Sequence, residues 1–225
     1  MTLLASWRDA WQQLGASNPD ESLFHQLVAC YSEPHRKYHT MQHLKECFAH
    51  LEALRSVAER PAEVALALWF NDAIYKTRRN DNEQKSAAWA RNSAQAGGLS
   101  GESAARIFSL IMVTKHNAVP VARDAEVVVD ADLAILGAEP ARFDEYEHQV
   151  REEYSWVPEP LYRRERRKVL QAFSSRPSIY RTEHFRASRE AQARENIARS
   201  LARLQAQPGV PPDVPAGASR RQGRG

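Results

Sequence analysis

The sequence predicts an all-helical protein that folds as one domain. Apolar residues recur at helical spacing through almost the whole chain of 225 residues, and no sustained alternation of β-branched residues bounded by turns interrupts them. With 43% hydrophobic residues, the chain can bury one sizeable core. We therefore expect a single-domain helical bundle over residues 1–206.

The individual helices follow from apolar spacing and from the residues at their boundaries. The first has an apolar face of four residues: Leu4, Trp7, Trp11 and Leu14. The second begins at the asparagine and proline of 18–19, a cap followed by a first-turn proline. A third is expected at about 38–58 and a fourth at 61–75, beginning with a proline. Further helices are expected at 82–96, 101–116, 123–137, 140–154, 159–174 and 184–206.

The last nineteen residues, 207–225, break this pattern with proline, glycine and arginine, and we expect them to form a disordered tail. They hold three arginines and one aspartate, a net +2 out of the whole chain's +3, which leaves the body near neutral. A near-neutral body argues against nucleic-acid binding. RNA binding through the tail and the arginine run at 163–168 is therefore the weakest alternative.

The cysteines and the N-terminus bear on the compartment. Cys30 and Cys47 each lie in a helical pattern, and neither has a partner at the spacing of a metal site. They are expected to be free thiols that fill apolar space, which is typical of a protein in a reducing compartment. Charges at Arg8 and Asp9 interrupt the N-terminal apolar run too early for a signal peptide, and no long uncharged apolar stretch follows. We expect a cytoplasmic protein that makes no membrane contact. No pattern indicates an oligomeric state.

Three aspartates lie where the core should be. Asp72 lies in the apolar segment 64–75, and Asp130 and Asp132 lie in the apolar run 127–136. A buried carboxylate is costly unless it is paired or bound to a cation. Because residues two apart on a helix point about 200° apart, only one of the last two can aim directly at a small site. Asp132 has only apolar neighbours three and four residues away, so we expect it to be the more deeply embedded ligand, with Asp130 in support.

Two histidines stand one helical turn apart at the start of the third helix. His39 and His43 are four residues apart and so share a face, which suits two metal ligands or one ligand beside an acid or base. The alternative is structural: the aspartates pair with arginine or lysine, and the histidines cap or solvate a helix. The combination of buried acids and paired imidazoles favours a divalent-metal site.

The order His43, then Asn71-Asp72, then Asp132 resembles the signature of the HD superfamily of metal-dependent phosphohydrolases, which is histidine, histidine-aspartate, aspartate. More closely, the chain resembles an uncharacterised bacterial branch of predicted metal-dependent HD phosphohydrolases. The resemblance covers about residues 3–205. It is carried by seven short stretches: 33–39, 69–75, 81–83, 114–116, 130–137, 151–154 and 193–196.

The resemblance implies that His43, Asp72 and Asp132 are metal ligands and that position 71 supplies a second histidine. This chain has Asn71 there, whose neutral amide oxygen is a weaker donor than imidazole for zinc or iron and suits magnesium or manganese better. Three outcomes stay open. A harder metal binds through Asn71, His39 or His116 substitutes as a ligand, or the site has lost its metal. Magnesium or manganese is favoured, with zinc, iron or nickel as alternatives.

The function implied by the resemblance is hydrolysis of a phosphoester of a small metabolite or nucleotide by metal-activated water. By the same resemblance, His39 protonates the leaving oxygen. The alternative is a degenerate, non-catalytic HD scaffold that binds a ligand or a protein partner, because of Asn71.

Four further residues are candidates for supporting roles. Glu83 is a candidate for orienting water or holding a second metal, although a capping box from Asp81 to Gln84 is the favoured interpretation of this stretch. Lys115, at the end of an apolar helix, is a candidate catalytic cation, with a helix-dipole partner as the alternative. Arg36 and Lys37 are candidates for holding the substrate phosphate, and a solvated loop is the alternative.

Overall fold

The computed structural model describes residues 3–16 and 20–206. Within these ranges the chain forms ten α-helices and two short 3₁₀ helices and no β-strand, which confirms the predicted all-α class. The expected cap at 18–19 and the expected tail at 207–225 lie outside the described residues. No helix in the described ranges is long and apolar enough to cross a membrane.

The helices follow one another with short connections. In chain order they are α1 Leu3–Gln13, α2 Glu21–Tyr31, α3 Met41–Leu54, α4 Pro61–Phe70, α5 Asn82–Ala96, α6 Gly101–Met112, η1 Val113–Lys115, α7 Arg123–Leu133, η2 Ala134–Gly137, α8 Pro140–Glu153, α9 Glu159–Ser174 and α10 Glu183–Gln205. Predicted and observed ranges agree to within one residue for α5, α8, α9 and α10.

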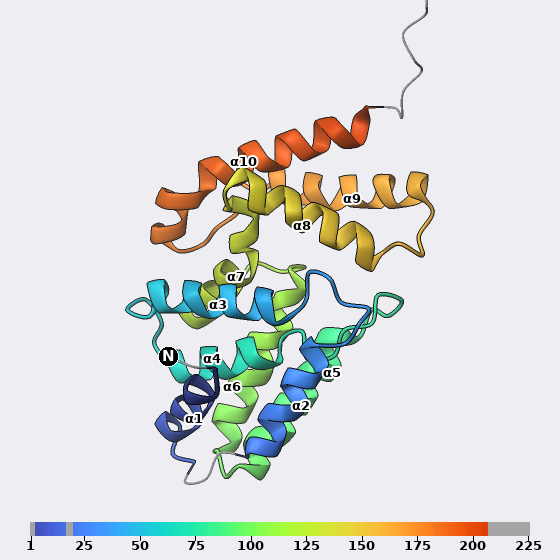
Figure 1. Cartoon of the computed structure of the whole chain (residues 1–225). Coiled ribbons are helices and arrows are strands. Elements are labelled where there is room, and N and C mark those ends of the chain that lie inside the picture. Colours follow the sequence, from blue (N-terminus) through green and yellow to red (C-terminus); the bar gives the residue numbers. More distant parts are fainter. Residues whose placement is uncertain (1–2, 17–19, 207–225) are drawn as a thin grey trace, which may run out of the picture.

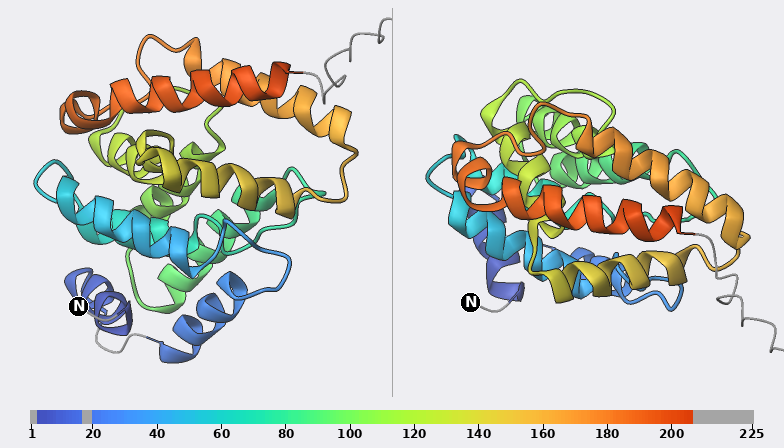
Figure 2. Two further views of the ribbon diagram at one scale, coloured as in Figure 1. Left: turned by 45° about the horizontal axis from the view of Figure 1, so that its top comes forward. Right: turned by 90° about the horizontal axis from the view of Figure 1, so that it is seen from above.

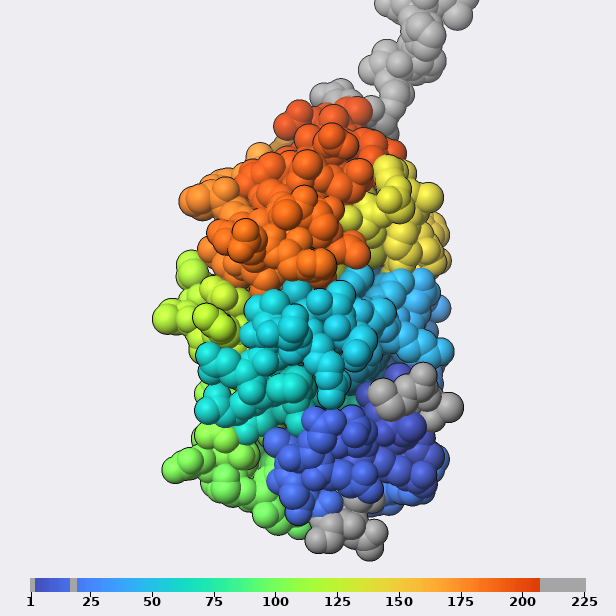
Figure 3. Space-filling view, turned by 90° about the vertical axis from the view of Figure 1, so that its left-hand side faces the viewer, coloured from blue at the N-terminus to red at the C-terminus, as the bar shows by residue number. Residues whose placement is uncertain are grey.

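The helices stack in three levels (Figures 1 and 2). Helices α1, α2, α5 and α6 lie at one end, α3, α4 and α7 in the middle, and α8, α9 and α10 at the other end. Figure 3 shows the same stacking from the side, with α1 below, α3 and α4 in the middle and α10 above. The four predicted metal ligands lie in the helices of the middle level or directly after one of them.

Helix α4 is the centre of the core. Its residues 62–70 are all buried, as the apolar sequence from Val64 onward predicts. Trp69 packs edge-on against Trp7 of α1, with ring centroids 5.5 Å apart. The buried charge on this helix is Glu63, whose carboxylate accepts two hydrogen bonds, of 2.7 and 2.8 Å, from Arg106. Arg106 therefore compensates the buried charge of Glu63.

Four predicted helices end or begin differently. The third begins at Met41 instead of 38, because Thr40 is extended and accepts a hydrogen bond from the backbone of Gln42, and it ends at Leu54 instead of 58. The fourth ends at Phe70 instead of 75. The stretches predicted as 101–116 and 123–137 each change to a 3₁₀ helix before their predicted ends, at Val113 and Ala134.

The expected capping box over 81–84 is wrong. The Asp81 side chain makes no capping hydrogen bond to α5. Its carboxylate is paired instead with Arg79, at 2.7 Å, and with Lys85, at 3.0 Å. Two cations close to Asp81 in sequence thus compete with the backbone N–H groups of the helix for one carboxylate.

Candidate metal centre

Four elements bring the predicted ligands together. His43 lies in the first turn of α3, and Asn71 and Asp72 follow directly after α4. Asp132 is the second-last residue of α7, and His116 follows η1. All five residues therefore lie at helix ends, where side chains can converge without another helix between them.

The carboxylate of Asp132 lies between two imidazoles. Its Oδ1 is 3.1 Å from Nε2 of His43, and its Oδ2 is 2.9 Å from Nε2 of His116. Nε2 of His43 is also 3.4 Å from Oδ2 of Asp72. His43 thus faces both predicted aspartates, and His116 joins them as a second imidazole.

The electrostatics of this cluster favour positive charge at its centre. Burial lowers the pKa of His43, but Cys47, Tyr38 and the two aspartates outweigh it, and the pKa is raised well above its usual value. Burial raises the pKa of Asp132, but His116 and His43 outweigh it and hold that pKa low. The carboxylate stays ionised and attracts a cation, here a proton on His43. A divalent ion bound between these groups would replace that proton as the positive charge that compensates the carboxylates.

Asn71 is buried behind this cluster and bridges two side chains. Its amide nitrogen donates to Oδ1 of Asp132 at 3.3 Å, and its amide oxygen accepts from the hydroxyl of Tyr31 at 3.2 Å. The amide oxygen, which was the expected metal donor, therefore faces Tyr31. If the Asn71 side-chain amide were rotated by 180°, its oxygen would face Oδ1 of Asp132. Two oxygens in contact are favourable only when a cation lies between them.

Cys47 joins the cluster from one side. Among the described residues, one trio of histidine, cysteine and acidic side chains has ligand atoms that all lie within 4.8 Å of one another, namely His43, Cys47 and Asp132. The Cys47 sulfur is 3.7 Å from Nδ1 and 3.6 Å from Nε2 of His43. A metal on Nε2 lies in the ring plane, about 2.1 Å beyond the nitrogen. The Cys47 sulfur is almost equally far from both ring nitrogens, so it lies beside the ring and not in front of Nε2. It is therefore too distant to bind a metal ion held by Nε2 of His43.

His116 has a strained backbone. With φ of 54°, it is the one non-glycine residue in the left-handed region within the described part of the chain. Its carbonyl accepts a hydrogen bond of 2.8 Å from Arg176. Its Nδ1 is buried and has no hydrogen-bond partner. Such strain is retained where the surrounding structure fixes it and is often found at functional sites.

Arg36 ties together the two chain segments that carry the site. Its guanidinium donates to the carbonyls of His39, Asp72 and Ala73, at 3.2, 2.6 and 3.0 Å, and the residue is 3% exposed. Arg36 does not line the large cavity in front of this cluster, and its contacts give it a positioning role in place of the expected phosphate contact. Lys37 is exposed and does not line the cavity.

Glu153, at the end of α8, holds His39. One carboxylate oxygen accepts from the backbone N–H groups of residues 37–39 at 2.8, 2.9 and 2.9 Å. The other is 2.8 Å from Nδ1 of His39 and 2.8 Å from the hydroxyl of Tyr75. Burial raises the pKa of Glu153, but these hydrogen bonds, led by His39, lower it to about 2. The ring of His39 is therefore fixed in orientation.

No role was predicted for Glu153, although the apolar spacing of α8 carries a signal for one. Phe143, Tyr146, Val150 and Glu153 follow one another at spacings of three, four and three, and all four are buried. A carboxylate at the end of such an apolar face needs a partner, just as Asp72 does.

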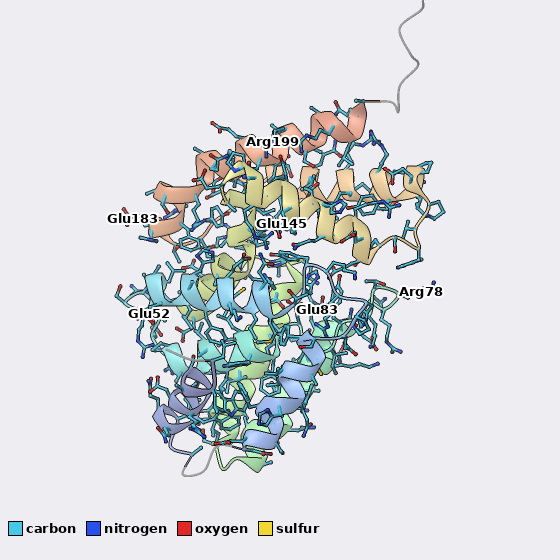
Figure 4. The ribbon with its side chains drawn as sticks, in the orientation of Figure 1. Glu52, Arg78, Glu83, Glu145, Glu183 and Arg199 are labelled. Atoms are coloured by element: carbon cyan, nitrogen blue, oxygen red, sulfur yellow. The ribbon has the colours of Figure 1, made fainter. Side chains whose placement is uncertain are left out.

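A cavity of about 770 Å³ opens in front of these groups. Its polar end is lined by seven side chains: His39, His43, Asp72, Glu83, Lys115, His116 and Asp132. Glu83 lies at the start of α5, below α8 (Figure 4). Nζ of Lys115 is 3.5 Å from the carbonyl of Asn80. The three residues predicted as catalytic, His39, Glu83 and Lys115, thus line the same cavity as three of the four predicted ligands.

A second cavity, of about 620 Å³, adjoins His43 and Asp132 and is lined also by Cys47, His50 and Arg142. Burial and the charge of Arg189 lower the pKa of His50 to about 4. Asp72, His116 and His39 do not line this second cavity. His43 and Asp132 therefore line both cavities, whereas Asp72, His116 and His39 line the first.

The expectation that Asp132 is more deeply embedded than Asp130 is wrong. Asp130 is 0% exposed, whereas the side chain of Asp132 is 13% exposed. Asp130 accepts hydrogen bonds of 2.8, 2.7 and 2.7 Å from Arg181 N–H, Thr182 N–H and the Thr182 hydroxyl. The start of α10 covers it. The i±3 and i±4 neighbours of a residue do not reveal what another helix places against it.

No protein-family model, curated protein or solved structure matches this chain. The site therefore has to be interpreted from its own geometry.

Proposed function

We propose that this chain is a metal-dependent phosphohydrolase of the HD kind, acting in the cytoplasm on a small phosphorylated metabolite or nucleotide. The observation that carries the proposal is the contact of His43 with both Asp132 and Asp72 at the polar end of a large cavity. A cluster of ligating and titratable groups in such a cavity is the usual mark of an active site.

The residues that would hold a divalent ion are His43, Asp72, Asp132 and His116. They supply two imidazole nitrogens and carboxylate oxygens, a mixed set that suits manganese or ferrous iron and accommodates magnesium. His116 then takes the place of the histidine that the HD signature has at position 71. Asn71 orients Asp132 through its amide N–H.

When bound, the ion would supply Lewis-acid activation of water and neutralise charge on the phosphoryl group. The chain's own residues would complete the reaction. His39 lines the cavity, and its Nδ1 is fixed by Glu153, so Nε2 of a protonated ring is free to donate to the leaving oxygen. Lys115 adds positive charge at the same end of the cavity.

The test compares metal content and turnover. Native protein is expected to bind about one equivalent of manganese and to hydrolyse p-nitrophenyl phosphate, and Asp72→Ala is expected to lose both. Asp81→Ala serves as the matched control, because Asp81 is an aspartate paired with surface cations away from the cluster. Unchanged turnover in Asp72→Ala would contradict the proposal.

A second candidate is a degenerate scaffold that binds a ligand without catalysis. It is favoured by the side chain of Asn71, whose amide oxygen is engaged by Tyr31 instead of facing the cluster. In that case the native protein binds no metal, and Asn71→His creates metal affinity. A native protein with one bound equivalent would exclude this candidate.

A further inference from the structure

We infer that the substrate is a phosphate ester of an apolar alcohol, whose apolar part lies along α9 while the phosphate meets the metal centre. This inference rests on the proposed function and names the substrate class. It is drawn from the apolar side chains that line the same cavity as His43 and Asp132.

Six apolar side chains from α8, the following connection and α9 line this cavity, together with the charged side chains of Glu165, Arg166 and Arg176. Val150 of α8, Val157 and Pro158 of the connection, and Leu161, Val169 and Phe173 of α9 all line it. A volume of about 770 Å³ exceeds what a phosphate group needs and falls within the range of pockets that enclose whole small molecules. The cavity thus has room for a sizeable organic group beyond the phosphate.

Helix α9 presents apolar side chains to the cavity. Leu161, Val169 and Phe173 are separated by eight and four residues and lie along one side of the helix, with Glu165 between the first two, and Phe173 also packs against the core. Over its sixteen residues only Arg166 and Leu170 are buried. An apolar stripe that is left uncovered costs free energy in water, and such stripes mark binding surfaces.

The exposed large apolar residues concentrate at this place. Within the described ranges five are exposed, and three of them, Trp156, Leu161 and Val169, line this cavity, with exposures of 46, 40 and 44%. The other two, Val119 and Val121, do not line it. The concentration of exposed apolar groups next to the candidate metal centre points to a ligand with an apolar part.

Trp156 is exposed but held in place. Its Nε1 donates to the hydroxyl of Thr77 at 3.0 Å, and the guanidinium of Arg78 lies 4.7 Å from the centroid of its ring. Figure 4 shows Arg78 at the outer edge of the molecule on this side. The indole therefore forms a fixed wall at the cavity mouth, joining the turn before α9 to the loop after α4.

Two of the polar side chains that line the cavity, Asn82 and Arg166, are already engaged, which disfavours a nucleobase beside them. Both amide atoms of Asn82 bond the backbone of Lys76, at 3.0 and 3.2 Å. The buried guanidinium of Arg166 is paired with Glu147 and donates to the hydroxyl of Tyr146 at 2.8 Å. A nucleobase buried here would lose its hydrogen bonds to water without replacement, whereas an apolar group loses none.

The experiment measures binding of n-alkyl phosphonates, which cannot be hydrolysed, to manganese-loaded protein by titration calorimetry. Methyl, butyl, hexyl and octyl phosphonate are used below their micellar concentrations, together with adenosine monophosphate. Affinity is expected to rise about two- to fourfold for each added methylene, the range for partial to full burial. Equal affinity for methyl and octyl phosphonate would overturn the inference, as would tighter binding of adenosine monophosphate than of octyl phosphonate.

Three variants locate the effect. Leu161→Ser and Val169→Ser are expected to weaken octyl phosphonate binding about fivefold to tenfold each and methyl phosphonate binding less than twofold. Val121→Ser removes an exposed valine outside the cavity and is expected to change neither. A chain-length dependence that persists unchanged in both α9 variants would place the apolar group elsewhere and contradict the inference.

Failure of the two proposals gives different results. If octyl phosphonate binds tightly but no phosphate ester is hydrolysed, the proposed function fails and the binding preference for apolar groups stands. If p-nitrophenyl phosphate is hydrolysed but alkyl chain length has no effect on binding, the proposed function stands and the substrate class fails.

Discussion

Asp130 and Asp132 lie two residues apart near the end of α7, yet their carboxylates meet different partners. Asp130 is completely buried and accepts only from the backbone and hydroxyl groups that begin α10. Asp132 is partly exposed in a cavity and lies between His43 and His116. Both carboxylates are compensated, but only the second by groups that can also bind a metal.

This contrast teaches that depth of burial does not identify a functional carboxylate. A carboxylate held by backbone N–H groups fixes two segments of chain to each other, as Asp124 also does at the start of α4 by accepting from the backbone of Glu59 and Arg60. A carboxylate held by imidazoles can exchange its partners for a metal ion.

The largest expected effect is on activity at Asp132. Asp132→Asn is expected to lower kcat/KM for p-nitrophenyl phosphate on the order of 10³-fold, because the variant would lose a carboxylate that holds the metal ion. Its melting temperature should stay within a few degrees of the native value, as checked by calorimetry. Activity within threefold of native in this variant would show that Asp132 has no role in the reaction.

Asp130→Asn is expected to lower stability and to leave activity nearly unchanged, the reverse of Asp132→Asn. It replaces an acceptor by a donor against buried N–H groups, so the free energy of unfolding should fall by about 3 kcal/mol, measured by urea denaturation. Activity of the folded fraction should remain near native. If this variant lost activity without losing stability, the contrast between the two carboxylates would be wrong.

A smaller loss is expected where His39 is held. Glu153→Gln weakens the hydrogen bond to Nδ1 of His39, and kcat is expected to fall about tenfold to a hundredfold. His39→Gln should lower kcat by at least as much, and the double variant should be no worse than His39→Gln alone. Additive losses would show that Glu153 acts independently of His39.

The smallest expected effect is on the pH dependence of stability, and it concerns two histidines of α3 whose pKa values are shifted in opposite directions. The pKa of His43 is raised among carboxylates, whereas that of His50 is lowered to about 4 by burial and by Arg189. A depressed histidine pKa stabilises the fold above the unfolded value of 6.5, and this stability is lost as the pH falls from 6.5 toward 4.

The measurement is the free energy of unfolding at pH 7 and at pH 4.5. Between pH 7 and pH 4.5 the free energy of unfolding should fall by about 2 kcal/mol less in His50→Gln than in the native protein. An equal loss in both proteins would show that His50 does not contribute to the acid sensitivity.

Much of the fold could be predicted, because apolar spacing and boundary residues are local properties. The apolar face of α1 and the uniformly apolar α4 were evident from the sequence alone. The helix ends at Phe70 and Met112 were not, because the chain continues into a turn after Phe70 and into a 3₁₀ helix after Met112 without a break in the apolar spacing. Contacts such as those of Arg36 with the carbonyls of Asp72 and Ala73 join residues more than thirty positions apart.

The candidate site could be predicted in part. Buried acids and paired histidines indicated His43, Asp72 and Asp132, which lie together. The position of His116 depends on a left-handed turn after η1, which no periodicity reveals. The sequence also could not show that Arg36 is buried, since the loop that carries it is polar throughout.

The most direct test of the account is titration of manganese into the native protein, Asp132→Asn and Asp130→Asn, followed by calorimetry. The account predicts about one equivalent bound by the native protein and by Asp130→Asn, and none by Asp132→Asn at the same concentrations. Loss of binding in Asp130→Asn with retention in Asp132→Asn, or no binding by the native protein, would contradict it.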